Sequence, residues 1–162
     1  MTPTPKAGET NLEYLRRRLC DVYPNLCPLF SIEFSDGVLQ VPSVALHSAA
    51  EDLKSLGFER FGFVTAVDRG DVFEMVYRLQ SGEFGVGIFL KTDIPRDAPS
   101  IATLTDLWPA ADWQEREVYD LFGIDFIGHP DMRRILLPED WVGYPLRKDY
   151  ADDSVIPRPD YI

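Results

Sequence analysis

Glu115 and Glu117 are the first residues to test for chemistry, because a pair of carboxylates can serve as a general acid and a general base. The two glutamates stand two positions apart in a segment that is expected to be helical. Residues at that spacing point to nearly opposite sides of a helix and cannot share one substrate. The spacing therefore disfavours a paired-carboxylate hydrolase.

His129 and Asp131 are the next candidates, since a histidine beside a carboxylate can act as a base or begin a metal site. His129 stands between Gly128 and Pro130, two residues that are typical of a tight turn. This setting favours a histidine that hydrogen-bonds its own turn or faces a partner protein. We therefore expect no catalytic histidine.

Arg133 and Arg134 follow directly and have the chemistry to bind a phosphate group. Pairing with a carboxylate is the favoured alternative, either with Glu117 or Asp120 of this chain or with a carboxylate of a partner. We expect ion pairing here and not ligand binding.

Cys20 and Cys27 are the only cysteines, and no Cys-x-x-Cys pair occurs. A structural zinc or iron–sulfur site needs about four ligands, which the chain does not supply even with His47 and His129. We therefore expect no cofactor and no metal in this chain. Two cysteines at this spacing also favour free thiols in a reducing compartment over a disulfide framework.

The bulk composition predicts one globular, acidic domain. The chain has 162 residues, 45% of them hydrophobic, and a formal net charge of −11, so it can bury a core. That much negative charge disfavours nucleic acid, which requires a basic footprint, and direct docking onto anionic lipid. The first ten residues carry no apolar stretch, and no run approaches the roughly 18 apolar residues of a membrane span. We expect a soluble, cytoplasmic protein.

Hydrophobic periodicity predicts two helices and five strands in the first hundred residues. A capping box from Thr10 to Glu13 begins a helix over 11–23, which Pro24 ends. A second helix is expected from Ser43, as its N-cap, to a stop at Gly57. The first two strands form a hairpin that turns at 35–37, and the three later strands run over 61–67, 73–79 and 84–90. In the strand over 61–67 the alternating residues are Phe61, Phe63, Thr65 and Val67.

The order α-β-β-α-β-β-β predicts an α+β fold, with two helices packed on one face of a mostly antiparallel sheet. A helix and an irregular segment rich in proline and arginine follow. The other face of the sheet is expected to be partly polar, because Glu74 and Arg78 lie on it. The expected organisation is a loose tail at 1–10, an α+β domain at 11–100, a docking segment of the same domain at 101–150 and an extended tail at 151–162. Pro157 and Pro159 lie in that tail, which we expect to be ordered only against a partner.

The expected helix over 113–122 is unusual, because both glutamates fall inside its apolar arc, which begins at Trp113. On a helical wheel Glu117 falls between Trp113 and Leu121, and Glu115 falls between Phe122 and Tyr119. Asp112 and Glu115 have the spacing of a second capping box, and Gly123 is expected to end the helix. A buried carboxylate without a partner is costly, so either the acids are paired or the helix is sandwiched against another protein. Four bases, Arg133, Arg134, Arg147 and Lys148, balance the acids within 129–150. This balance predicts a folded ion-pair network.

Three blocks of this region resemble a known family. They are EREVYDLFGI at 115–124, GHPDMRRIL at 128–136 and PLRKDY at 145–150, in that order. They are similar to the C subunit of the proton-pumping NADH:quinone oxidoreductases. This is the 30 kDa-type subunit or iron–sulfur protein 3 of complex I, and the J subunit of the cyanobacterial and plastid complexes. The chain stops soon after Tyr150, which resembles the plastid-type or archaeal branch.

The resemblance implies a cofactor-free subunit of the peripheral arm of complex I, with no catalytic residue of its own. It implies packing against the large quinone-site subunit and near the small iron–sulfur subunits. The iron–sulfur clusters, flavin and quinone are then held by partner subunits, and electron transfer to quinone is coupled to proton translocation. The electron donor stays open between NAD(P)H, ferredoxin and a reduced deazaflavin.

Two alternatives to this function remain. The chain could be the equivalent subunit of a membrane-bound hydrogenase or deazaflavin dehydrogenase complex, or it could be a free-standing small enzyme. The implied location is peripheral, on the cytoplasmic side of a cell membrane, or on the stromal or matrix side in an organelle. We expect one set of residues to form the ion-pair network and partner interface. They are Trp113, Glu115, Arg116, Glu117, Tyr119, Asp120, His129, Asp131, Arg133, Arg134, Arg147, Lys148, Asp149 and Tyr150.

Overall fold

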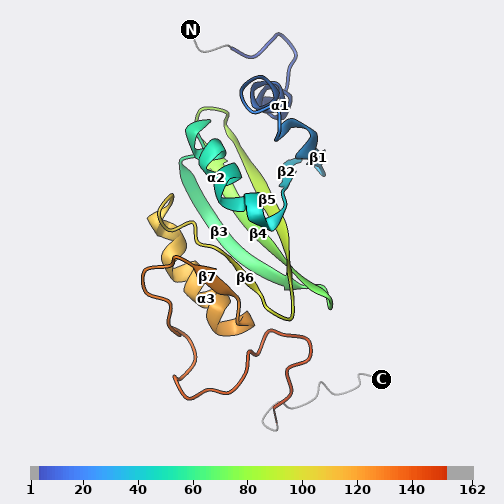
Figure 1. Ribbon diagram of the computed structural model, residues 1–162. Coiled ribbons are helices and arrows are strands. Elements are labelled where there is room, and N and C mark those ends of the chain that lie inside the picture. Colours follow the sequence, from blue (N-terminus) through green and yellow to red (C-terminus); the bar gives the residue numbers. More distant parts are fainter. Residues whose placement is uncertain (1–3, 153–162) are drawn as a thin grey trace, which may run out of the picture.

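A five-stranded sheet with the order β1-β2-β5-β4-β3 forms the centre of the computed structural model, which describes residues 4–152 (Figure 1). β2 runs parallel to β5, and the other neighbouring strands of this sheet are antiparallel. The strands are β1 Phe30–Glu33, β2 Asp36–Gln40, β3 Arg60–Asp68, β4 Val72–Ser81 and β5 Val86–Pro95. The α+β class and the mostly antiparallel sheet are confirmed. The predicted tail at 151–162 lies outside the described residues except for its first two positions.

α1 (Asn11–Val22) begins at the predicted capping box. The Glu13 N–H donates to the Thr10 hydroxyl, and the Thr10 N–H donates in return to the Glu13 carboxylate at 2.8 Å. Leu15 and Leu19 are buried in the core of the sheet. The local sequence is therefore sufficient to start this helix and to orient it.

α2 (Leu46–Ser55) lies across one face of the sheet and buries Leu46, Ala49, Ala50 and Leu53, as predicted (Figure 1). Ser43 does not cap it. A 3₁₀ turn over Ser43–Ala45 precedes the helix, and its hydrogen bonds take the N–H groups that a side-chain cap would have satisfied.

The register of β3 differs from the prediction. An irregularity of pairing lies between Phe61 and Phe63, and an extra residue at such a bulge moves every later side chain to the opposite face. Val64 and Ala66 are therefore buried, whereas Phe63 and Thr65 are exposed. The predicted alternation is correct in β4, where Phe73, Met75, Tyr77 and Leu79 are all buried.

The predicted hairpin forms between β1 and β2, but its turn lies earlier than 35–37. Phe34 and Ser35 occupy the turn with φ of 48° and 72°, which is the conformation of a type I′ turn. Gly37 already belongs to β2, where an added Cβ would lie 2.8 Å from Ile88 and 2.9 Å from Phe30. The glycine that suggests a turn in the sequence instead permits close packing.

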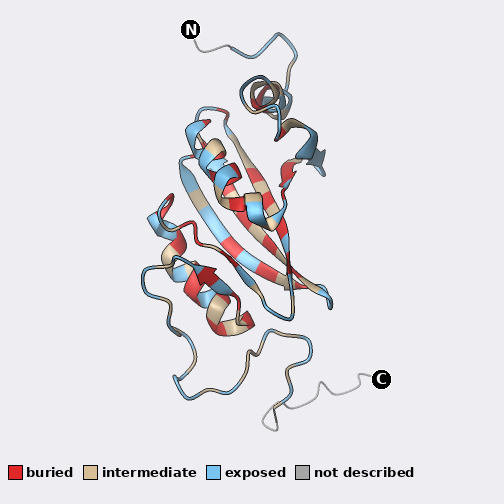
Figure 2. Cartoon of the chain, in the orientation of Figure 1, coloured by how far each residue is buried: buried red, intermediate tan, exposed pale blue. Residues whose placement is uncertain are grey.

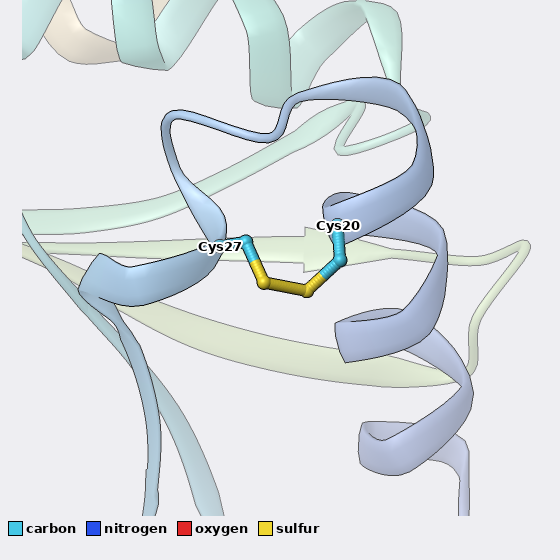
Figure 3. Close-up of a disulfide and its surroundings, with 2 residues drawn as sticks. All are labelled: Cys20 and Cys27. Carbon is cyan, nitrogen blue, oxygen red and sulfur yellow. A yellow bond between two sulfur atoms is a disulfide. The ribbon is translucent and has the colours of Figure 1, made fainter.

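Cys20 and Cys27 form a disulfide, and their Cα atoms lie 4.7 Å apart (Figure 3). The prediction of two free thiols is wrong. Backbone hydrogen bonds from Leu26 to Tyr23 and from Leu29 to Leu26 turn the chain back directly after α1, and this turn brings the two cysteines within bonding range. The bond joins the end of α1 to the chain that enters β1.

α3 (Asp112–Phe122) follows a 3₁₀ turn at Pro109–Ala111, and the short strands β6 (Ser100–Ala102) and β7 (Asp125–Ile127) pair in parallel beside it. Gly123 ends α3 with a φ of 68°, as predicted. The second capping box is wrong, because no side chain caps this helix. The chain from 129 to 152 is irregular and lies at the end of the molecule opposite α1 (Figure 1).

No helix within residues 4–152 is both long and apolar enough to cross a bilayer.

Candidate functional site

Asp120 on α3 anchors the start of the irregular chain. Its carboxylate is fully buried and accepts from the backbone N–H groups of Ile135, Leu136 and Leu137 at 2.7–3.0 Å, and from Arg134 at 2.7 Å. Burial alone would raise the pKa of Asp120, but these donors outweigh it and hold the pKa below its usual value. The side chain is satisfied and enclosed, so its role is structural.

Two arginines hold the rest of this chain against α3. Arg134 also donates to the carbonyls of Trp141 and Gly143, at 3.2 and 3.3 Å. Arg147 donates to the carbonyls of Phe122 and Gly123, which are free at the C-terminus of α3. Both guanidinium groups lie over the ring of Tyr144, at 5.3 and 4.8 Å from its centre. Arg134 and Arg147 thus tie the irregular chain to α3 largely through backbone carbonyls, in addition to the ion pair with Asp120.

Asp68 at the end of β3 is a second anchor, which the sequence did not indicate. It is buried and accepts from the backbone N–H of Lys148 at 2.9 Å, while Arg96 bridges it to Asp149. The Lys148 N–H is the largest cause of the lowered pKa of Asp68, helped by the N–H of Gly70 and by Arg96 and opposed by burial. Lys148 thus contributes through its backbone and Asp149 through its charge.

Glu115 is also fully buried, but without a cation. Its carboxylate accepts from the Thr103 hydroxyl and from the Leu104 N–H at 2.8 Å. Burial raises the pKa of Glu115 to about 7, against these two donors, and Asp106 and Asp112 add to the rise. Glu115 therefore fastens the chain after β6 to α3, and the prediction of a basic partner is wrong for it.

Glu117 is exposed, and no hydrogen bond or ion pair of its side chain occurs in residues 4–152. The prediction that it lies in the apolar arc and pairs with an arginine is wrong. The reason is that Trp113, one boundary of the predicted arc, is itself 67% exposed. Arg133 is also exposed and pairs with Asp131 at 3.0 Å.

His129 serves its own turn, in agreement with the favoured interpretation. Its Nδ1 accepts from the Asp131 N–H at 3.1 Å, and its Nε2 lies 3.3 Å from the carbonyl of Asp112.

The Arg116 guanidinium lies 5.0 Å from the centre of the Trp113 ring. Arg116 itself is buried and donates to the carbonyl of Arg133 at 3.3 Å. The exposed ring of Trp113 is therefore the side chain here that can contact a partner, and tryptophan is a residue type that often anchors protein interfaces.

The remaining predicted residues are two tyrosines. Tyr119 is half-buried on α3, and the Tyr150 hydroxyl donates to Asp152 at 2.9 Å. Exposed apolar side chains also project from the irregular chain. They are Leu136, Val142 and Leu146. We call these three residues, with the exposed Trp113, the docking surface.

Metal ligands are not clustered among the described residues. In the range 4–152 no group of three or more histidine, cysteine or acidic side chains is placed to hold an ion. The two fully buried carboxylates of α3 are both engaged in hydrogen bonds that fix the fold. The geometry of this region fits attachment to another protein.

Comparison with known proteins gives one consistent family. Residues 39–154 match the model of the family described as "Respiratory-chain NADH dehydrogenase, 30 Kd subunit". The C subunit of the NADH-quinone oxidoreductase of Moorella thermoacetica is 44% identical over 126 residues, covering 74% of this chain and 85% of that protein. The C/D subunit of the Phocaeicola vulgatus enzyme is 42% identical over 124 residues, but those residues are only 23% of that longer protein.

Two solved structures are also similar. A trypsin-resistant fragment of Nqo5 superposes with a TM-score of 0.61 at 31% identity, covering 72% of this chain and 98% of the fragment. A chain of the membrane-bound sulfane sulfur reductase, an archaeal respiratory membrane complex, superposes with a TM-score of 0.76 at 26% identity, covering 93% of this chain and 95% of that one.

Proposed function

Because the chain belongs to the family of respiratory-chain NADH dehydrogenase 30 kDa subunits, we propose that it is a cofactor-free structural subunit in the peripheral arm of a complex I-type quinone oxidoreductase. The observation that carries this proposal is the irregular chain at 129–152. It is fastened to α3 by Asp120, Arg134 and Arg147, and it exposes apolar side chains without enclosing a reactive group. A rigid loop that presents apolar side chains is a preorganised interface.

The proposed partner of the docking surface is the large quinone-site subunit. The C/D proteins support this assignment, because there the matching segment is part of a longer chain whose name joins the two subunits. Iron–sulfur clusters, flavin and quinone would lie on partner subunits, including the small iron–sulfur subunits near this one. The chain then supports electron transfer to quinone, and the coupled proton translocation, by holding its neighbours in place. It would lie on the cytoplasmic side of the membrane, or on the stromal or matrix side in an organelle.

A second candidate is the equivalent subunit of a related membrane-bound respiratory complex with a different donor or acceptor. The similarity to a chain of the archaeal sulfane sulfur reductase over 93% of this chain favours keeping it. The donor-binding subunits that co-purify with this chain would separate the two candidates.

Arg134→Ala tests the structural role. Removing the cation from the buried Asp120 should cost about 3–5 kcal/mol of stability, so less assembled complex should be recovered from solubilised membranes on native gels. Quinone reductase activity should fall in proportion, with normal turnover for each assembled complex. Arg133→Ala is the matched control, because Arg133 pairs with Asp131 in solvent and its loss should leave assembly unchanged. Full assembly of the Arg134 variant with lost turnover would refute a structural role.

A further inference from the structure

The two edges of the five-stranded sheet are protected to different degrees. Along the β3 edge, Gln114 of α3 accepts from the Val64 N–H at 2.9 Å and donates to the Gly62 carbonyl at 3.5 Å. β1 forms the other edge, and Ser31, Ile32 and Glu33 are exposed along it (Figure 2). An uncovered edge is a template for pairing with another strand.

The hairpin register leaves backbone groups of β1 available. With a two-residue turn after Glu33, the pair Glu33 and Asp36 exchanges hydrogen bonds, and the next pair, Ile32 and Gly37, does not. The N–H and C=O of Ile32 therefore point away from β2. Outside the strand ladders, the hydrogen bonds among residues 4–152 do not use them. These two groups match the needs of one residue of an added strand.

An apolar groove of about 500 Å³ runs beside this edge, between the first turn of α1 and the hairpin. Leu12 and Ile32 supply its apolar lining, and Ile32 is 42% exposed. The other lining residues are polar: Thr10, Asn11, Glu13 and Ser35. Leu15 and Leu19 of α1 are buried in the same core as Phe30 of β1, and the Cys20–Cys27 disulfide also joins the two elements where the thiols are oxidised (Figure 3). The two walls of the groove are therefore fixed relative to each other before any partner arrives.

Phe34 at the tip of the hairpin is fully exposed and has a φ of 48°. Type I′ turns favour Asn and Gly at these positions, and a bulky aromatic residue is unfavourable there. Neither turn preference nor burial explains a phenylalanine at this place. An exposed aromatic beside an open strand edge is instead suited to anchor a bound chain.

We propose that β1 accepts an extended segment of another polypeptide of the complex, which adds a strand to the sheet and packs apolar side chains against Ile32 and Phe34. Glu13 lines the groove and Glu33 ends the edge strand β1, and we call these two acids the rim. Each accepts from a hydroxyl group and has no ion pair in residues 4–152. The added segment therefore alternates apolar residues with Lys or Arg. The proposal rests on the proposed function only in that the partner belongs to the same complex. β1 lies before the residues that match the family model.

The double substitution Phe34→Asn with Ser35→Gly separates binding from folding. It supplies the residues that the turn prefers, so the melting temperature of the isolated full chain should rise by about 3 °C. Retention of the same chain in salt-washed membrane complex should weaken about tenfold, as expected when an aromatic anchor is removed. Val44→Asn is the matched control, because Val44 is 95% exposed on a different element. It should leave retention unchanged, whereas Glu33→Lys should weaken retention by reversing the rim charge.

A photoreactive phenylalanine analogue at position 34 of the membrane complex identifies the partner. The expected cross-link is to a segment of another subunit that alternates apolar and basic residues. Cross-links only to lipid or to a second copy of this chain would overturn the proposal, and so would unchanged retention of the double variant. Failure of the wild-type chain to co-purify with any quinone-site subunit would overturn the proposed function instead. If the wild type and the double variant co-purify equally well with the quinone-site subunit, only the proposed strand pairing is overturned.

Discussion

The two buried carboxylates of α3 have different neighbours, and their pKa values move in opposite directions. Asp120 and Glu115 lie five residues apart on one helix and are both 0% exposed. Asp120 receives three backbone N–H groups and a guanidinium, and its pKa is lowered. Glu115 receives one hydroxyl and one N–H, and burial raises its pKa to about 7. Both side chains are shielded from solvent, so the difference lies in their neighbours: Asp120 has more donors, one of them a cation, whereas Glu115 has two neutral donors and the carboxylates of Asp106 and Asp112 nearby.

This difference gives the two residues opposite effects on stability as the pH changes. Asp120 has a lowered pKa, so its contribution is present above the pKa of the unfolded chain and is lost as the pH falls through the folded value. Glu115 has a raised pKa, so the folded chain retains a proton that the unfolded chain releases. Its carboxyl therefore makes the fold less stable as the pH rises from about 4.5 to about 7.

Asp120→Asn should have the largest effect. The amide can still accept from some of the backbone N–H groups, but it leaves the Arg134 guanidinium partly buried without a counter-charge. We expect a loss of about 3–5 kcal/mol in the free energy of unfolding, measured by urea denaturation at pH 7. A loss below about 1 kcal/mol would mean that Arg134 finds other acceptors and that the network is not the main anchor.

Glu115→Gln tests the comparison between Asp120 and Glu115 through the pH dependence of stability. In the wild type, the free energy of unfolding should fall by up to about 3 kcal/mol between pH 4.5 and pH 7 because of Glu115. Glutamine keeps an acceptor for the Leu104 N–H and cannot ionise, so this part of the pH dependence should disappear. Denaturation curves of both proteins across that range provide the measurement. Parallel pH profiles would show that Glu115 is not the titrating group.

Glu117→Gln should have the smallest effect, within about 0.5 kcal/mol. Glu117 is exposed on the same helix and makes no ion pair within the described residues, so it serves as the exposed counterpart of the two buried acids. Urea denaturation and native-gel assembly should both be unchanged. Lost assembly with unchanged stability would place Glu117 in a subunit interface.

The sequence indicates where the ion-pair network lies, but it predicts only some of the individual pairs correctly. The ion pair of Arg134 with Asp120 is one of those that the sequence predicts, and the structure contains it. The helical wheel predicts a buried Glu117 only if Trp113 points inward, whereas the Trp113 ring on α3 is exposed to solvent. Asp68 was missed because the N–H that it binds belongs to Lys148, eighty residues away in the sequence. No local pattern reports a bond to a distant backbone group.

Local interactions were readable from the sequence alone. The Thr10 capping box, the buried face of α2, the alternation of β4 and the stop at Gly123 each depend on residues within one or two turns or along one strand. The family resemblance was readable for a similar reason, because its three blocks are contiguous in the sequence.

Only the tertiary structure decided the bulge in β3, the bond between Cys20 and Cys27, the neutral partners of Glu115 and the open edge of β1. Each of these depends on where a second segment passes. A one-residue bulge reverses a face without changing composition, and a turn of a few residues decides whether two thiols meet. The burial and donors of a carboxylate likewise depend on the chain that packs over it, and that chain sets whether its pKa rises or falls.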